Sequence, residues 1–113
     1  MLVARSTHPG WLSNSFAVAV AGGPALLVDS GADPLPLVAE LERWDATPVV
    51  LLRTHAHHDH VEHEDELAAR YGIPVVAEPG EWDWDGLHVR GVATPGHSDD
   101  MVAFVVNDEA VEG

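Results

Sequence analysis

A short stretch near the middle of the chain, THAHHDHVEH at residues 54–63, holds five of the eight histidines. It directly follows PVVLL, an apolar run that favours a buried strand. Side chains alternate along extended backbone, so His55 and His57 would project to the same side. Asp59 and His60 follow where the chain is expected to turn into a helix. Imidazole and carboxylate groups at this spacing indicate a metal site, against the alternative of a solvated polar loop.

A third imidazole is needed to complete such a site, and the stretch TPGHSDD offers His97. Pro95 fixes the backbone before it, and Gly96 permits a close approach. Nitrogen and oxygen ligands without thiolate suit Zn²⁺ at about 2.0–2.2 Å and also accept iron or manganese. A structural zinc site has four protein ligands, whereas a catalytic one keeps a position for water. Three histidines and one water would form an open site of the second kind.

The elements that must position these residues alternate between strands and helices. Two apolar strands are expected within residues 16–31, joined through glycines and Pro24, in a sheet covered on both faces. A helix is predicted over residues 33–44, with Asp33 as its N-cap and Pro34 in the first helical position. A buried strand at residues 47–54 then leads into the histidine cluster.

The second half of the chain is predicted to contain one more helix and several strands. The helix EHEDELAARYG should end at Gly72, and its acidic start is interpreted as solvated. IPVVAE, GLHVRGVA and MVAFVV follow as strand candidates, and the terminal NDEAVEG is expected to lie inside a further strand. The carboxyl end of a strand in such an α/β arrangement is where ligands collect.

Composition limits the possible partners. The 113 residues form one domain, and five Lys and Arg against nineteen Asp and Glu give a formal net charge of −14. Such a chain has no basic patch for nucleic acid or for an anionic membrane surface. It has no cysteine, which excludes disulfides and thiolate ligands, and no run reaches the roughly 20 apolar residues of a membrane helix. With no visible signal peptide, a cytoplasmic protein is predicted.

The histidine cluster resembles the signature of the metallo-β-lactamase superfamily, a Thr followed by His-any-His-any-Asp-His after a buried strand. That signature is matched by Thr54, His55, Ala56, His57, His58, Asp59 and His60. TPGHS is similar to the family's next motif, and NSFAVAVAGGPALLVDSGADP is similar to its opening hairpin with an Asp-any-Gly turn. The resemblance runs from Trp11 to Gly113.

This resemblance implies an α+β fold, the αββα sandwich of the family, of which residues 1–113 would form roughly the first half. It also implies that His55, His57 and His97 hold a first metal, and that Asp59 and His60 contribute to a second. The family's bridging acid would follow Gly113, and its last histidine lies further on. The domain therefore looks truncated at its C-terminus, without its second sheet and outer helices.

A truncated sandwich would leave the apolar face of FAVAV, LLV and VVLL open to water. Exposed apolar patches of that size mark interfaces or aggregation sites. Self-association, or a complementing chain that covers the face, is the expected consequence.

Several other residues can be interpreted either as structural or solvated or as functional. His58 and His63 match no ligand position and are expected in solvent, and His8 and His88 are expected to be structural or exposed. Asp29 either orients a ligand histidine or shapes the turn before Gly31. For the tryptophans of EWDWDG, packing is favoured over a substrate groove.

The function that follows from the resemblance is metal-dependent hydrolysis of a small thioester, lactone or related ester or amide. Water activated by zinc would be the nucleophile, and Asp59 would orient it and accept a proton. Whether the 113 residues are active by themselves is left open. The alternatives are a non-catalytic metal-binding half that pairs with a second chain, and an inactive truncated product.

Overall fold

A computed structural model describes most of the chain, namely residues 2–7, 14–30, 34–54, 63–84, 86–93 and 102–107, and the backbone of 109–111. The elements of the first half are β1 (Leu2–Thr7), β2 (Asn14–Ala19), β3 (Pro24–Val28), α1 (Leu35–Arg43) and β4 (Thr47–Leu52). Those of the second half are α3 (Glu64–Tyr71), β5 (Val75–Val76), β6 (Gly80–Trp84), β7 (Leu87–Ala93), β8 (Val102–Val106) and β9 (Glu109–Val111).

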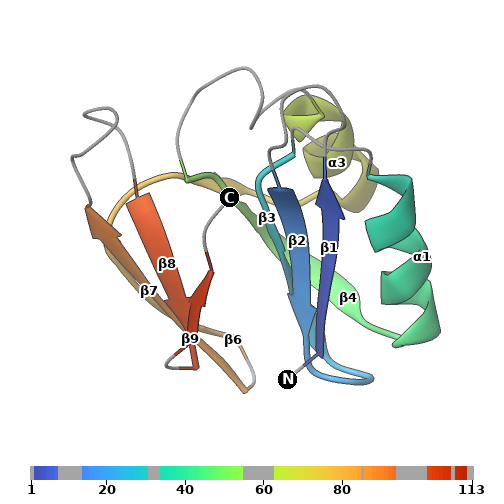
Figure 1. Ribbon diagram of the computed structural model, residues 1–113, viewed down its shortest axis with the longest axis horizontal. Coiled ribbons are helices and arrows are strands. Elements are labelled where there is room, and N and C mark those ends of the chain that lie inside the picture. The colour runs from blue at the N-terminus through green and yellow to red at the C-terminus, as the bar shows by residue number, and fades with distance from the viewer. Residues whose placement is uncertain are drawn as a thin grey trace.

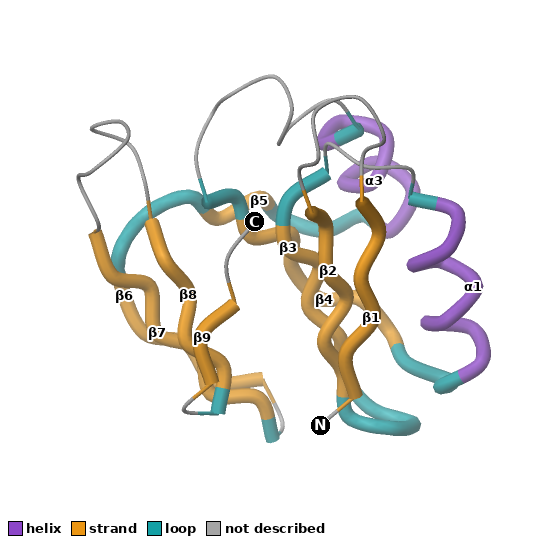
Figure 2. The backbone as a smooth tube through the Cα atoms, in the orientation of Figure 1, coloured by secondary structure: helices purple, strands orange, loops and turns teal. Residues whose placement is uncertain are grey.

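The strands form two sheets that face each other (Figure 1). The first sheet has the order β1-β2-β3-β4-β5, antiparallel from β1 to β3 and parallel from β3 to β5. The second sheet is antiparallel throughout, in the order β6-β7-β8-β9. Figure 2 shows α1 and α3 on the side of the first sheet that is turned away from the second. The described residues therefore form three layers: helices, sheet and sheet.

Helices cover the first sheet on its outer face because apolar side chains recur along one side of each. Leu37 and Leu41 of α1 and Leu67 of α3 are buried among the small and aliphatic residues of that face. Those sheet residues are Ala17, Ala19, Ala25, Leu27 and Leu51. Leu37 and Leu41, four residues apart, thus lie on the inward side of α1.

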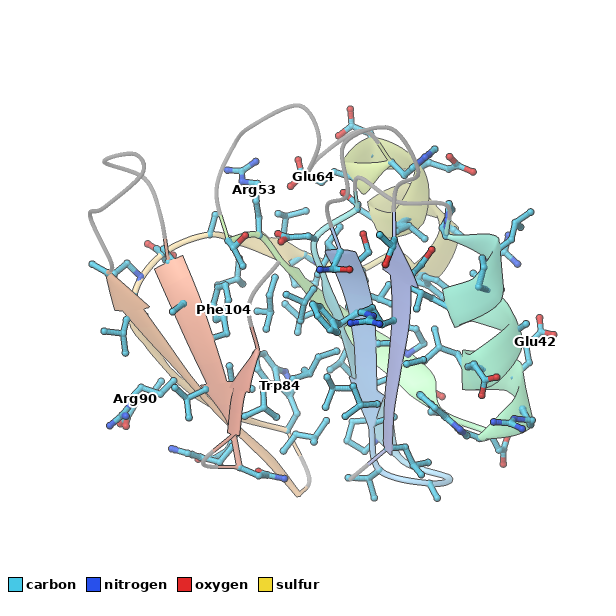
Figure 3. The ribbon with its side chains drawn as sticks, viewed as in Figure 1. Glu42, Arg53, Glu64, Trp84, Arg90 and Phe104 are labelled. Carbon is cyan, nitrogen blue, oxygen red and sulfur yellow. The ribbon has the colours of Figure 1, made fainter. Side chains whose placement is uncertain are left out.

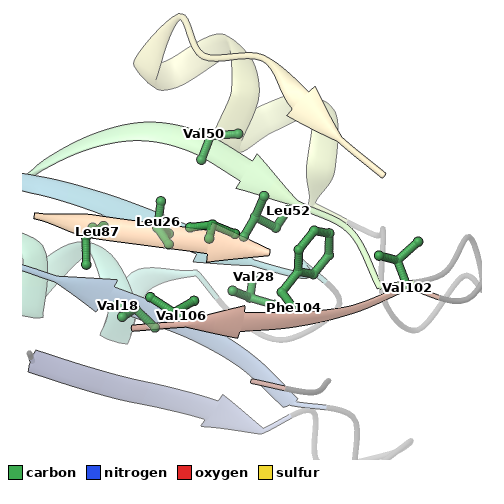
Figure 4. Close-up of a cluster of buried hydrophobic side chains, with 10 residues drawn as sticks. Val18, Leu26, Val28, Val50, Leu52, Leu87, Val102, Phe104 and Val106 are labelled. Carbon is green, nitrogen blue, oxygen red and sulfur yellow. The ribbon is translucent and has the colours of Figure 1, made fainter. Parts of the chain in front are cut away.

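The main core lies between the two sheets (Figure 4). The first sheet contributes Val18, Leu26, Val28, Val50 and Leu52, and the second contributes Leu87, Val89, Val102, Phe104 and Val106. Phe104 is the largest fully buried side chain of the described residues and belongs to this cluster. Both faces of β3 and β4 are thus covered, as their nearly continuous apolar sequences predict.

The expectation that this chain lacks its second sheet is wrong. β6 to β9 fold back over the first sheet, so the inner faces of β2, β3 and β4 are buried rather than open. The sequence predicted β7 and β8 as strands but gave no partner for their apolar sides, because pairing between distant strands leaves no local mark. Since the face is covered, it offers no argument for self-association.

Turn chemistry explains where several elements end. Gly22, at a φ of 69°, lies in the turn that joins β2 to β3, as predicted. Gly72 closes α3 in the left-handed conformation, at φ 62° and ψ 39°, which confirms the predicted helix end. Pro34 takes the N-cap position of α1, one residue later than predicted, since its carbonyl accepts the N–H of Val38. Asp33 lies outside the described residues.

Two strands have weak signals in the sequence. β1 is an edge strand of mixed polarity, and it is held by pairing with β2 from Leu2↔Ala19 to Thr7↔Asn14. β6 alternates exposed acids with half-buried tryptophans, and it pairs with β7 from Gly80↔Gly91 to Trp84↔Leu87. In the described part of the chain, no helix has both the length and the apolar character needed to cross a membrane.

The stability of the sandwich should depend strongly on Phe104. Phe104→Ala should lower the free energy of unfolding by about 3–5 kcal/mol, because it leaves a cavity between two sheets that cannot easily collapse. Val92→Ala is the matched control on the neighbouring strand, since Val92 is 40% exposed, and it should cost about 0.5 kcal/mol or less. Urea unfolding measures both values. Similar small losses for the two variants would contradict the assignment of the core.

Candidate metal centre

The predicted metal ligands His55, His57, Asp59, His60 and His97 all lie outside the described residues. They belong to two segments, 55–62 and 94–101. Within the described ranges, no group of three or more His, Cys, Asp or Glu side chains could hold a metal ion. The structure therefore bears on the site through the described residues that directly precede and follow the two segments.

Thr54 directly precedes the first segment, and both its backbone and its side chain are hydrogen-bonded. One carboxylate oxygen of Asp29 accepts the backbone N–H of Thr54 at 2.8 Å, and the other accepts its hydroxyl at 2.7 Å. Both residues are only 1% exposed. A charged acceptor and two donors in a buried setting form strong hydrogen bonds, so Thr54 has a defined position at the end of β4.

Asp29 occupies an uncommon backbone conformation. Its φ is 59°, in the left-handed region, and its N–H donates to the carbonyl of Leu52 at 2.8 Å. Of the two predicted roles of Asp29, shaping the turn is compatible with this conformation. A contact with a ligand histidine stays a prediction, because the ligand histidines lie outside the described residues. What sequence reasoning did not anticipate is that this carboxylate holds Thr54.

His63 directly follows the first segment, and it contacts Ser30, the residue after Asp29. The N–H of His63 donates to the carbonyl of Ser30 at 2.8 Å. His63 is also the N-cap of α3, which begins at Glu64. Residues 29 and 30, after β3, thus contact both ends of the segment, Thr54 and His63.

The second segment, with His97, connects two paired strands. Ala93 at the end of β7 lies opposite Val102 at the start of β8. The N–H of Val102 donates to the carbonyl of Thr54 at 2.7 Å. Thr54 therefore contacts residues at the boundaries of both sheets. The residue before the first ligand-bearing segment is thus hydrogen-bonded to the residue after the second, even though the two segments are far apart in sequence.

A partly buried ion pair borders the first segment. Nη1 of Arg53 lies 3.2 Å from each carboxylate oxygen of Glu64, and the two side chains point toward each other in Figure 3. Their side chains are 31% and 15% exposed. The interpretation of the acidic helix start as solvated is therefore wrong for Glu64, although Asp65 and Glu66 are exposed. No local pattern could reveal this pair, because its partners come from different elements.

Of the histidines outside the predicted ligand set, the structure describes His63 and His88. His88 is exposed on β7, and its Nδ1 lies 2.9 Å from Oδ1 of Asp83 on the paired strand. Nδ1 of His63 lies 3.3 Å from Oε2 of Glu66, and the side chain of His63 is 28% exposed. His8 and His58 lie outside the described residues. Trp82 and Trp84 stack at 6.3 Å between ring centroids and pack against the core, which confirms their predicted packing role.

The fold and the sequence together define a metallo-hydrolase class. The model of the metallo-beta-lactamase superfamily matches residues 8–111, and the chain belongs to this family of metal-dependent hydrolases. The resemblance noted in the sequence is thereby confirmed, as is the α+β sandwich fold.

Individual relatives agree with this assignment. The chain is 32% identical to the hydroxyacylglutathione hydrolase of Serratia proteamaculans, over 73% of this chain and 38% of the relative. It is 30% identical to that of Acidiphilium cryptum, over 92% of this chain and 49% of the relative. Its fold is similar to the crystal structure of ETHE1 from Myxococcus xanthus, with a TM-score of 0.81 and 21% identity, over 96% of this chain and 55% of that one. The chain thus spans half or less of the length of these two hydrolases.

The contact between Asp29 and Thr54 yields a stability prediction. Asp29→Asn should lower the free energy of unfolding by about 1–3 kcal/mol, because the amide can accept with one atom only and leaves a buried donor without its partner. Asn tolerates the left-handed backbone, so the change isolates the carboxylate. Asp45→Asn is the control, since Asp45 is exposed at a φ of 52°.

Urea unfolding compares the two variants, and Asp45→Asn should change the free energy of unfolding by about 0.5 kcal/mol or less. Equal values for both variants would mean that the Asp29 carboxylate does not stabilise the end of β4.

Proposed function

We propose that this chain carries the metal-binding part of a zinc-dependent hydrolase that acts on a small thioester or lactone. The observation that supports the proposal most is the hydrogen bond from the N–H of Val102 to the carbonyl of Thr54, which joins the residue before the first ligand-bearing segment to the residue after the second. Family membership supports the hydrolytic class. A cytoplasmic location and a small-molecule substrate remain parts of the proposal.

In this proposal, His55, His57 and His97 hold the first metal, and Asp59 and His60 contribute to a second. The donor set fits zinc, because imidazole nitrogen and carboxylate oxygen are ligands that Zn²⁺ accepts, and iron or manganese remain compatible with the same donors. The described contacts also fit, since Asp29 and Thr54 fix the backbone immediately before His55. Metal sites bind tightly when the residues around the ligands hold those ligands in a fixed orientation.

When bound, the metal supplies Lewis acidity, which polarises a substrate carbonyl and makes water a usable nucleophile near neutral pH. The residues of the chain have separate tasks. Asp59 orients the attacking water and accepts its proton, and the three histidines stay neutral as ligands. Thr54 provides a fixed residue directly before His55.

The substrate class is proposed from the relatives. The two hydrolases described above are named for hydroxyacylglutathione, which is a thioester. A net charge of −14 disfavours polyanionic substrates such as nucleic acid. The family's remaining ligands, including the acid that bridges two metals, would come from further sequence or from a complementing chain.

Metal content tests the ligand assignment. The purified chain should retain close to one equivalent of zinc after dialysis, because three imidazoles complete the first site without further ligands. His55→Ala, His57→Ala and His97→Ala should each abolish retention, as measured by elemental analysis. His58→Ala and His63→Ala are the matched controls and should retain the metal. Equal losses in all five variants would indicate a generic histidine-rich loop instead.

Hydrolysis tests the role of Asp59. The chain by itself should turn over an S-acyl thioester slowly, and joining it to a downstream segment that supplies the bridging acid should raise both zinc content and rate. In that longer protein, Asp59→Asn should lower kcat by about 100-fold or more, in line with loss of a general base. His58→Ala should keep the rate. An unchanged rate in Asp59→Asn would replace the two-metal scheme with one at His55, His57 and His97.

A further inference from the structure

Arg53 and Glu64 form an ion pair, and in the sequence they stand on either side of the ligand segment 55–62 and of its flanking residues Thr54 and His63. Arg53 directly follows β4 and precedes Thr54, and Glu64 is the first residue of α3, directly after His63. Between them lie Thr54, segment 55–62 and His63. Nη1 of Arg53 contacts both oxygens of Glu64 at 3.2 Å (Figure 3). The contact thus joins the strand end before the ligands to the helix start after them.

Both partners of the pair are fixed by their own elements. The N–H of Arg53 donates to the carbonyl of Val76 on β5 at 3.0 Å. α3 is held against the first sheet by Leu67, which is 2% exposed. With side chains 31% and 15% exposed, the pair is less screened by water than an ordinary surface pair. It therefore constrains the distance between β4 and α3 at the point where the ligand segment leaves and returns.

We propose that Arg53 and Glu64 are positioning residues for the metal centre, which their ion pair preorganises by fixing both ends of segment 55–62. The inference rests on the proposed metal-binding function. Ordering a segment costs conformational entropy, and when the folded protein has already ordered its ends, binding of the metal is opposed less. Residues that orient metal ligands from outside typically change metal affinity about 10–100-fold when they are lost.

A purely electrostatic role makes a different prediction, which allows a clean test. Removing the Arg53 charge would leave a carboxylate near a site for a divalent cation, and long-range attraction would then tighten binding. Removing the Glu64 charge would leave a guanidinium there and weaken binding. If the pair acts by positioning, both changes weaken binding, because each breaks the same contact.

The experiment measures zinc affinity by competition with a chelator for the 113-residue chain and for Arg53→Met, Arg53→Lys and Glu64→Gln. Arg53→Met and Glu64→Gln should each bind zinc about tenfold more weakly, and Arg53→Lys should recover part of the loss, since an ammonium can still pair with Glu64. The absorption spectrum of bound Co²⁺ should broaden or shift in the two weakened variants, which reports altered ligand geometry. Urea unfolding without metal separates these effects from a loss of folding.

Arg43→Met is the matched control, because Arg43 is exposed and pairs with Glu40 within the same helix, α1. It should leave zinc affinity and the Co²⁺ spectrum unchanged. If Arg53→Met does not fold, Glu64→Gln and Arg53→Lys carry the comparison.

Three results have distinct meanings. Unchanged affinity in Glu64→Gln and Arg53→Met would overturn the inference, and so would tighter binding in Arg53→Met. Failure of the unaltered chain to bind either metal would overturn the proposed function itself, and the positioning role with it.

Discussion

The end of strand β4 is the point on which the arrangement of this protein depends. The backbone of Thr54 donates to Asp29, which follows β3, and its carbonyl accepts from Val102, which starts β8 in the other sheet. Three chain segments that are distant in sequence thus meet at one residue. The buried carboxylate of Asp29 makes this junction stiff, because a displaced Thr54 would leave polar groups without partners in a site closed to water.

Packing explains why this junction can be so well defined. Two sheets enclose an apolar core, and helices bury the opposite face of the first sheet, so β3 and β4 have little freedom to shift (Figures 1 and 4). Close-packed interiors resist small displacements. The left-handed conformation of Asp29 is uncommon for a residue with a side chain, and such conformations persist when the surroundings determine them.

The same organisation connects the fold to the chemistry that is proposed for it. The carboxyl ends of the parallel strands β3 and β4 provide Asp29, Ser30, Arg53 and Thr54, all of which contact residues that border the ligand segments. In sheets of this kind, ligands collect at the carboxyl ends of strands. Well-fixed residues directly before and after a short segment that carries ligands also favour tight and specific metal binding.

The sequence by itself determined the family, the types of the candidate ligands and most of the regular elements. These features are local: the histidine spacing, the apolar runs of β3, β4 and β8, and the glycine that ends α3 can all be read within a few residues. Only the tertiary structure showed that the second sheet covers the first. It likewise revealed that Asp29 holds Thr54 and that Glu64 pairs with Arg53. These contacts join residues far apart in the chain, and distant pairing depends on the packing of whole elements, which no short window of sequence records.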